Sequence, residues 1–422
     1  MFALVDCNSF FASAERVFQP ALADKPVCVL SNNDGCVVSL TNEAKALGIR
    51  RGDPLFKIKD IVEKKDVAVF SSNYVLYAAM SARVMHILSE AAPDIDVYSI
   101  DEAFLNLEGI TNEQLKVKMA ELAARVPRWT GIPISIGVAP TKTLAKVAAK
   151  YAKKYKGYHN VCFIDSEEKR KKALADFPIA DVWGIGRQSV KKLEFFGITT
   201  AAAFAAKEPE WIKRNFNVTG LRTWNELRGT PCIELDSLAE KQSICVSRSF
   251  GKTVTDYEGL KESVANFAAD VARKLRKQHS AANIITVFIR TDRFNTSVPQ
   301  YSNFVSQTLT VATADTAEII TFSHEILKTV FRRGFAYKKA GVIASGIIPD
   351  TAIQQHIFDT VGNRDKRQRL NKAVDVINAI NGRDTIKYAA QESASGAEWS
   401  SRKDFKSRNY LTNINELIEV RI

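Results

Sequence analysis

Two adjacent carboxylates lie between apolar segments in the stretch Tyr98-Ser99-Ile100-Asp101-Glu102-Ala103-Phe104-Leu105-Asn106-Leu107. Upstream, Ile95 and Val97 alternate with more polar residues, which predicts a β-hairpin or strand bend with Asp101 and Glu102 at or near its turn. Neighbouring acids on buried strands repel each other and lose hydration, a cost that a divalent cation between them offsets. A solvated turn is the alternative, because most carboxylates simply stay exposed.

A third acid follows an apolar strand at the beginning of the chain. Phe2-Ala3-Leu4-Val5 ends on Asp6. Carboxylate oxygens are the ligands that Mg²⁺ prefers, and a pair of such ions stabilises the attacking and leaving oxygens of phosphoryl transfer. We therefore predict that Asp6, Asp101 and Glu102 form a catalytic site for two Mg²⁺ ions.

Composition points to a polyanionic partner. The 422 residues suffice for two to four domains, and a net charge of +12 with a pI of about 9.3 favours nucleic acid, then an anionic membrane surface. No stretch approaches 18 uninterrupted apolar residues, so we expect no membrane span. The first residues form a strand rather than a signal peptide, and we expect a cytoplasmic, nucleoid-associated protein.

The six cysteines include no C-x-x-C pair, which argues against a zinc site or a disulfide framework: Cys7, Cys28, Cys36, Cys162, Cys232 and Cys245.

A helix after Asn8 or Ser9, either of which could cap it, leads to a small unit over residues 25–73. Strands at 26–30 and 36–40 flank a turn at Asn32–Gly35, where Asp-Gly accepts positive φ. A short helix then ends at Gly48. Three basic residues form either a solvated face or a triphosphate site: Lys45, Arg50 and Arg51.

A helix from Tyr74, the acidic hairpin, a helix over 113–126 and a strand over 133–139 precede a basic helix that Thr141 caps. Residues 141–175 hold ten Lys/Arg against three Asp/Glu. We give equal weight to a solvated amphipathic helix and to phosphate contact by its lysines. These are Lys142, Lys146, Lys150, Lys153 and Lys154.

Residues 165–231 are predicted to be all helical. Within them, Gly184-Ile185-Gly186-Arg187 is typical of a helix-hairpin-helix, whose glycines let backbone N–H groups approach a DNA phosphate. An ordinary tight turn between two helices is the alternative.

The pattern over residues 243–346 is β-α-β-β-α-β, the split-βαβ arrangement. Residues 271–340 carry eleven Lys/Arg and four Asp/Glu. We expect Arg248, Arg290 and Arg293 to lie on a sheet face along a phosphate backbone.

The remaining residues are mostly polar, with one short helix suggested by Val374, Ile377 and Ile380. Residues 389–401 indicate a linker or disorder. Gln354-Gln355-His356-Ile357-Phe358 suits either a docking peptide or a stray hydrophobic contact.

Four ordered motifs over residues 1–350 resemble the Y-family translesion DNA polymerases, and within them the UmuC-type branch. They are Asp6-Cys7-Asn8-Ser9-Phe10-Phe11, Tyr98-Ser99-Ile100-Asp101-Glu102-Ala103-Phe104, Gly137-Val138-Ala139-Pro140-Thr141-Lys142-Thr143-Leu144-Ala145-Lys146 and Val182-Trp183-Gly184-Ile185-Gly186-Arg187.

The resemblance implies a multidomain α/β (α+β) right-hand polymerase. A ferredoxin-like palm would span 1–20 and 74–164, small fingers 21–73, and a helical thumb with the helix-hairpin-helix 165–232. A split-βαβ little finger would span 240–348, followed by a tail over 349–422 with a candidate clamp-binding peptide.

The resemblance also assigns roles to residues. Asp6, Asp101 and Glu102 would bind two Mg²⁺ ions together with the backbone carbonyl of Cys7. Phe11 would be the steric gate that excludes a ribose 2′-OH, with Phe10 beside it, and the dNTP triphosphate would contact Lys45 and Lys153. Lys45 stands where many members have Arg, so the charge is kept without bidentate geometry.

Primer-template DNA would bind Lys142, Lys146, Gly184, Gly186, Arg187, Arg248 and Arg290. Gln354, Ile357 and Phe358 resemble a sliding-clamp motif in which Ile357 replaces Leu, and a UmuD-type dimer and RecA would be further partners. The implied function is error-prone lesion bypass in SOS mutagenesis, without proofreading. A nucleotidyl cyclase-like palm enzyme and a non-catalytic DNA-binding accessory protein are the alternatives.

Overall fold

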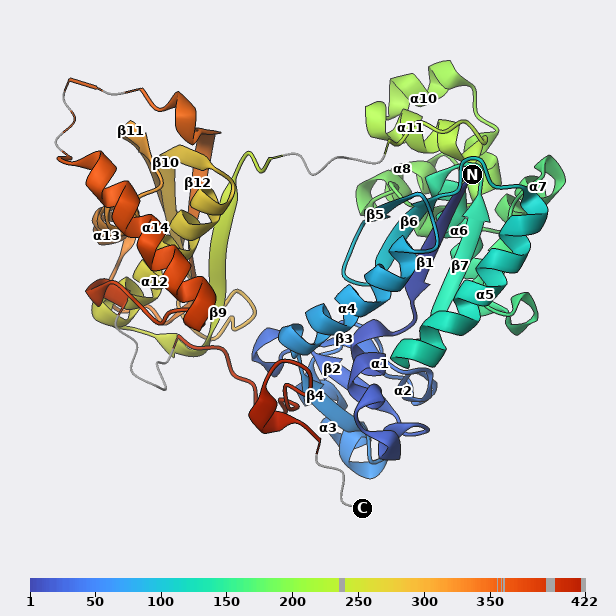
Figure 1. Cartoon of the computed structure of the whole chain (residues 1–422), viewed down its shortest axis with the longest axis horizontal. Coiled ribbons are helices and arrows are strands. Elements are labelled where there is room, and N and C mark those ends of the chain that lie inside the picture. Colours follow the sequence, from blue (N-terminus) through green and yellow to red (C-terminus); the bar gives the residue numbers. More distant parts are fainter. Residues whose placement is uncertain (235–239, 355, 358, 360, 392–398, 419–422) are drawn as a thin grey trace. The chain divides into compact units, whose positions relative to one another are not determined.

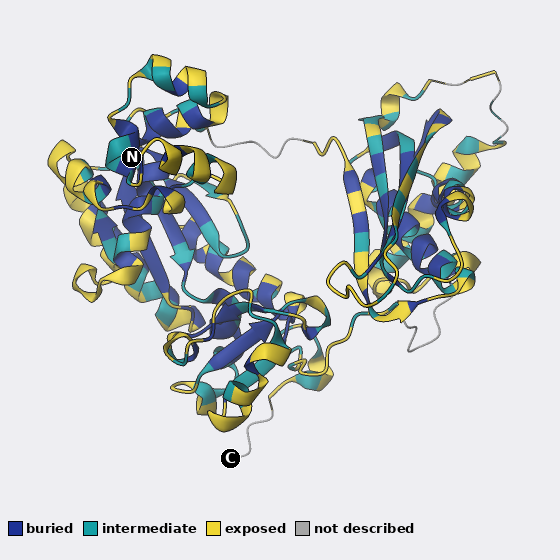
Figure 2. Cartoon of the chain, turned by 180° about the vertical axis from the view of Figure 1, so that it is seen from behind, coloured by how far each residue is buried: buried dark blue, intermediate teal, exposed yellow. Residues whose placement is uncertain are grey.

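Two compact units make up the computed structural model of this chain, which describes residues 1–234, 240–354, 356–357, 359, 361–391 and 399–418 (Figure 1). The first unit comprises Met1–Ser237 and Phe405–Ile422, and the second comprises Leu238–Asp404. Both combine sheets with helices, so the predicted mixed α/β fold is confirmed. In each unit the buried residues follow the strands and the helix faces packed on them (Figure 2).

The main sheet of the first unit has five strands in the order β5-β6-β1-β7-β8. Central β1 runs antiparallel to both neighbours, whereas β8 is parallel to β7. The predicted acidic hairpin is confirmed: β5 and β6 pair antiparallel and the chain bends between them at residues 98–101. The strands are β1 (Phe2–Cys7), β5 (Asp94–Val97), β6 (Glu102–Asn106), β7 (Ile134–Ala139) and β8 (Val161–Phe163).

Helices cover both faces of this sheet. Helices α4 (Tyr74–Ser89) and α5 (Asn112–Thr130) contribute to the core that includes Ala3 and Val5, on one face of β1. Helix α6 (Lys142–Lys154) shares the other core with Leu4 and Phe104, on the opposite face, and Thr141 caps it as predicted.

A glycine brings α6 close to the sheet. A Cβ built on Gly137 of β7 would lie 2.1 Å from both the Ala145 carbonyl oxygen and the Ala149 nitrogen. Because glycine has no side chain, α6 can lie directly on β7 at this position.

A second, three-stranded sheet in the order β3-β2-β4 belongs to the first unit. The positive φ angles of its turn lie at Asn33 and Asp34 rather than at Gly35, which corrects the turn that we expected. Ser9 precedes α1 in the left-handed region and its side chain does not cap the helix. The elements are α1 (Phe10–Val17), β2 (Val27–Leu30), β3 (Val37–Leu40), α2 (Asn42–Ala46), α3 (Leu55–Lys64) and β4 (Ala68–Ser71).

Residues 165–231 are helical as predicted. The Gly-Ile-Gly turn follows a single 3₁₀ turn, Ile179–Asp181, and leads into α8. The helices are α7 (Glu167–Ala175), α8 (Arg187–Phe195), α9 (Ala201–Ala205), α10 (Pro209–Asn215) and α11 (Val218–Leu227).

The second unit has the predicted β-α-β-β-α-β order around a four-stranded sheet, β11-β10-β12-β9. Strand β12 lies between β9 and β10 and is antiparallel to both, so the split-βαβ arrangement is confirmed. Helices cover one face (Figure 1). The elements are β9 (Ile244–Val254), α12 (Tyr257–Lys277), β10 (Ser280–Thr291), β11 (Ser302–Thr313), α13 (Thr316–Val330) and β12 (Tyr337–Pro349).

The last part of the chain is more ordered than we expected. Helix α14 (Arg364–Asn381) is long, because ion pairs such as Arg276–Asp375, 2.7 Å, fix it against α12 where its own apolar periodicity is weak. Trp399, within the predicted linker, stacks edge-on against Phe267 of α12, while residues 392–398 of that linker lie outside the described residues. From Phe405 the chain belongs to the first unit. No described helix is long and apolar enough to cross a membrane.

Candidate active site

Strand pairing brings the three predicted acids together at one end of the main sheet. Asp6, near the end of β1, lies directly opposite Glu102, the first residue of β6. The next backbone nitrogen, that of Cys7, donates to the carbonyl oxygen of Asp101, 2.9 Å. Asp6 lies two residues from Leu4, and Glu102 lies two residues from Phe104, so each acid shares a face with its apolar neighbour. That is the face that α6 covers.

Each of the three carboxylates has its own partner. Lys153 Nζ lies 2.7 Å from Asp6 Oδ1, and Lys146 Nζ lies 2.7 Å from Glu102 Oε2. The hydroxyl of Ser99 donates to Asp101 Oδ1, 2.6 Å. In this arrangement no group of three or more His, Cys, Asp or Glu side chains within the described residues converges as the ligands of one metal ion.

The donors nevertheless fit Mg²⁺ in number and chemistry. Three carboxylates on adjacent backbone positions need positive charge between them, which two lysines supply here. Burial, and then the negative charges of Asp6 and Asp101, raise the pKa of the Cys7 thiol far above its ordinary value. That thiol therefore stays neutral, and oxygen is the donor that Cys7 offers, through its backbone carbonyl.

A second lysine lies near Lys153. Partial burial, followed by the positive charge of Lys153, lowers the pKa of Lys45, whose Nζ donates to Asn42 Oδ1, 3.0 Å. Lys45 on α2 thus lies near Lys153 on α6, the lysine that pairs with Asp6. Such a pair suits a polyphosphate.

Phe11 and its neighbour Phe10 have different environments. The Phe11 ring stacks on Tyr77 with centroids 4.4 Å apart at 14°, and meets Tyr74 edge-on at 6.0 Å. Phe10 is 3% exposed in the core, so its contact with a nucleotide stays a prediction that this burial does not favour.

The DNA contacts of Lys142 and Lys146 stay predictions, which the surroundings of the two side chains do not favour. Lys142 is 2% exposed, and its ammonium donates to the carbonyl of Glu234, 2.8 Å. Lys146 pairs with Glu102 and is ringed by three aromatic side chains, with its Nζ 4.5, 5.2 and 5.7 Å from the ring centroids of Tyr98, Trp183 and Phe104. Both lysines serve the interior of the first unit.

None of these three aromatic residues was predicted from the sequence to belong to the site. Trp183 Nε1 donates to the Tyr98 hydroxyl, 3.2 Å, and so joins the Gly-Ile-Gly turn to the acidic hairpin. The available signal was position, because Tyr98 precedes the acid pair by three residues and Trp183 directly precedes Gly184.

The Gly-Ile-Gly turn presents open backbone at the start of α8. Gly184 has φ +87°, and a Cβ there would lie 2.5 Å from Thr223 Oγ1. A Cβ on Gly186 would meet no atom within 4 Å, and Arg187, the first residue of α8, is exposed. These features suit a phosphate contact through Gly186 and Arg187.

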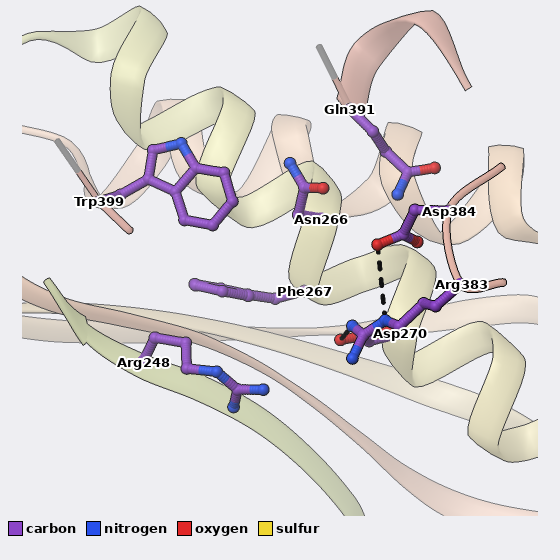
Figure 3. A pocket seen from close by; sticks show the side chains of 8 residues that line it. All are labelled: Arg248, Asn266, Phe267, Asp270, Arg383, Asp384, Gln391 and Trp399. Atoms are coloured by element: carbon purple, nitrogen blue, oxygen red, sulfur yellow. Dashed lines mark hydrogen bonds and ion pairs between the residues drawn. The ribbon is translucent and has the colours of Figure 1, made fainter. Parts of the chain in front are cut away.

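In the second unit, the uncovered face of the sheet carries Arg290 and Lys339, which are directly opposed on β10 and β12. Lys339 was not predicted as a DNA contact, although it directly precedes the buried Ala340 and therefore points to the opposite face of the sheet. Arg248 lies instead on the face that α12 covers, where it lines a hollow with Phe267 and Trp399 (Figure 3). The expectation that Arg248 shares a face with Arg290 is therefore wrong.

The candidate docking peptide is only partly described. Gln354 is exposed and the Ile357 side chain is 90% exposed, whereas Phe358 lies outside the described residues.

Comparison of the sequence with known proteins identifies the family of this chain. Residues 5–150 match the impB/mucB/samB family and residues 241–357 match the C-terminal domain of that family. Residues 368–420 match a domain of unknown function, DUF4113. Protein UmuC of Salmonella typhimurium is 41% identical over the full length of both chains, and protein ImpB of Salmonella typhimurium is 39% identical over 99% of both.

More distant relatives extend the comparison. DNA polymerase IV of Caulobacter vibrioides is 25% identical over 90% of this chain and 91% of its own length. A solved chimera of the Y-family DNA polymerases Dbh and Dpo4 covers 82% of this chain and 99% of its own, with a TM-score of 0.65 and 21% identity, and DinB from Sulfolobus solfataricus reaches 0.51.

The fold of this chain is similar to that of the solved Y-family DNA polymerases. The chain belongs to the impB/mucB/samB family, which is the UmuC-type family.

Proposed function

We propose that this polymerase extends a primer past damaged template bases, using Asp6, Asp101 and Glu102 as the ligands of two Mg²⁺ ions. The observation that carries the proposal is the strand register that sets Asp6 opposite Glu102 and next to Asp101, with two lysines beside them. When bound, the two ions lower the pKa of the primer 3′-OH and stabilise the charge on the leaving pyrophosphate.

The chain's own residues prepare that reaction. Lys153 and Lys45 bind the triphosphate and replace its hydration with fixed positive charge. Contact with an anion also relieves the mutual repulsion of the two lysines. Once a nucleotide takes Lys153, the carboxylate of Asp6 is released from its ion pair to act as a ligand.

Phe11 is the candidate steric gate. Its ring stands on Tyr77, and a bulky ring fixed in this way would collide with a ribose 2′-OH and admit a deoxyribose. The support of the ring by Tyr77 matters, because Phe11 can distinguish ribose from deoxyribose only if its ring does not move away from the 2′-OH.

The division into subdomains follows the same analogy. Residues 1–20 and 74–164 would form the palm, 21–73 the fingers, 165–232 the thumb and 240–348 the little finger. Primer-template DNA would contact Gly186 and Arg187 of the thumb, and Arg290 and Lys339 of the little finger.

The small size of the candidate fingers favours low fidelity. A three-stranded sheet with short helices offers little surface for checking the shape of a base pair. We therefore propose error-prone synthesis without proofreading, in SOS mutagenesis, in the cytoplasm at the nucleoid. A UmuD-type dimer, RecA and a sliding clamp that binds Gln354, Ile357 and Phe358 are the proposed partners.

A template-dependence assay tests this proposal. The full chain, Mg²⁺ and four dNTPs are incubated with primed DNA, with unprimed DNA and without DNA. We expect primer extension that follows the template sequence, with no product in the other two reactions. Cyclic nucleotide formed without DNA would establish the cyclase alternative, and binding of primed DNA without extension would establish the accessory-protein alternative.

A further inference from the structure

The C-terminal segment Phe405–Leu411 docks onto the first unit. The backbone nitrogen of Ser71, at the end of β4, donates to the carbonyl of Phe405, 3.0 Å, and the nitrogen of Phe405 donates to Ser71 Oγ, 3.0 Å. Tyr410 stacks on Phe18 with centroids 4.8 Å apart at 11°. Tyr410 and Leu411 pack against the same core as α4.

This segment inserts a hydroxyl into a buried polar chain. Ser407 Oγ donates to Glu15 Oε1, 3.0 Å, and the Tyr77 hydroxyl donates to the same oxygen, 2.7 Å. Asn73 Nδ2 donates to Ser407 Oγ, 3.1 Å, and to the carbonyl of Arg408, 3.2 Å. Glu15 and Tyr77 are completely buried and Asn73 is 1% exposed.

This hydrogen-bonded network reaches Tyr77, the residue on which the candidate gate Phe11 stacks. Tyr77 supports the Phe11 ring at 4.4 Å, and Asn73 caps α4, the helix that carries Tyr77. A buried carboxyl with two donors is held in one position, and it holds the donors in turn. The second oxygen of Glu15 has no hydrogen-bond partner among the described residues, so Oε1 alone fixes this group.

We propose that Ser407 is a positioning residue for Phe11, acting through Glu15 and Tyr77, so that the C-terminal segment sets the discrimination between deoxyribose and ribose. The inference rests on the proposed role of Phe11 as the steric gate. It assigns to a segment about 400 residues along the chain a part in selecting the sugar.

Ser407 would act by restricting the movement of Glu15 and Tyr77. Without the Ser407 hydroxyl, Glu15 loses one of its two donors, and the carboxyl and the Tyr77 hydroxyl gain freedom to move. The ring of Tyr77 then supports Phe11 less firmly. A gate that yields admits a ribose 2′-OH more often, while a deoxyribose, which does not press on the gate, is affected less.

The test compares kcat/KM for one dNTP and for its ribonucleotide on the same primed template. We expect Ser407→Ala to lower the ratio of the two values about tenfold, the effect of one buried hydrogen bond. Ser407→Thr, which retains the hydroxyl, should restore the ratio. Ile414→Ser, a control three residues beyond this segment at a position that is 81% exposed, should leave the ratio unchanged.

Two further variants separate the inference from its foundation. Phe11→Ala should lose most of the discrimination, and if it does not, the proposed gate itself is wrong. Tyr77→Phe removes the other donor to Glu15 and keeps the ring, so it should reproduce the effect of Ser407→Ala. If Phe11→Ala loses discrimination while Ser407→Ala and Tyr77→Phe both retain it, the positioning role of Ser407 is overturned and the gate stands.

Discussion

Asp6 on β1 faces Glu102 on β6 across one antiparallel pair, and that single register creates the candidate metal site. A slip of one residue would turn one of the two carboxylates to the opposite face of the sheet. The neighbouring pairs, Val5 with Ala103 and Leu4 with Phe104, are buried and resist such a slip. The core thus fixes the geometry of the acids.

Gly137 should be intolerant of any side chain. In Gly137→Ala the new Cβ would lie 2.1 Å from backbone atoms of α6, so the helix must move away from β7. We expect the free energy of unfolding to fall by about 3 kcal/mol, measured by urea denaturation. Gly157→Ala is the control, because its Cβ would meet no atom within 4 Å. Equal stability of the two variants would contradict the close packing described here.

Removal of Lys153 should weaken nucleotide binding. A hydrogen bond to a charged group contributes about 1.5–3 kcal/mol, so Lys153→Ala should raise KM for a dNTP by roughly tenfold or more. Lys154→Ala is the matched control, since the Lys154 ammonium lies over the Tyr155 ring, 5.1 Å from its centroid. Similar KM values for the two variants would exclude Lys153 from the triphosphate site.

As pH rises, nucleotide binding should weaken at a lower pH than the titration of an ordinary lysine would cause. Burial and the charge of Lys153 lower the pKa of Lys45, so its positive charge is complete below that lowered pKa and is lost as pH rises through it. KM for a dNTP should therefore rise at a lower pH than an ordinary lysine would cause. Lys45→Arg keeps its charge at all these pH values and should flatten the profile. Identical pH profiles would show that Lys45 does not contact the nucleotide.

DNA affinity should depend on the uncovered face of the second unit. The double variant Arg290→Ala, Lys339→Ala should reduce the slope of log K against log salt by about 0.9 for each lost phosphate contact, measured by fluorescence anisotropy. Arg248→Ala removes a charge from the face that α12 covers and should change the slope less. A larger effect of Arg248→Ala would mean that the wrong face has been assigned to DNA.

Local patterns predicted much of this fold. The strand ending at Asp6, the acidic hairpin, the cap at Thr141 and the β-α-β-β-α-β order all depend on period and turn residues within short windows. The resemblance then supplied the class of enzyme. The side chains around the acids were harder to predict, because they depend on how α6 is rotated on β7.

The positions of particular side chains show that limit. Lys142 is buried and Lys146 is enclosed by rings, although both belong to a basic helix. Arg248 has the same parity along β9 as the buried Val246 and Phe250, a readable sign that it points to the covered face. The contact of Ser407 with Glu15 joins positions 392 residues apart, and no local pattern could predict it.

The most direct test of the central claim is primer extension past a single abasic site, with Mg²⁺, dNTPs, a UmuD-type partner and a RecA filament. The wild-type chain and Asp101→Ala are compared at equal DNA occupancy. Because metal ions contribute several kcal/mol to such a reaction, we predict that Asp101→Ala slows extension on the order of a thousandfold while DNA binding is retained. Extension by Asp101→Ala at the wild-type rate would contradict the assignment of the metal site.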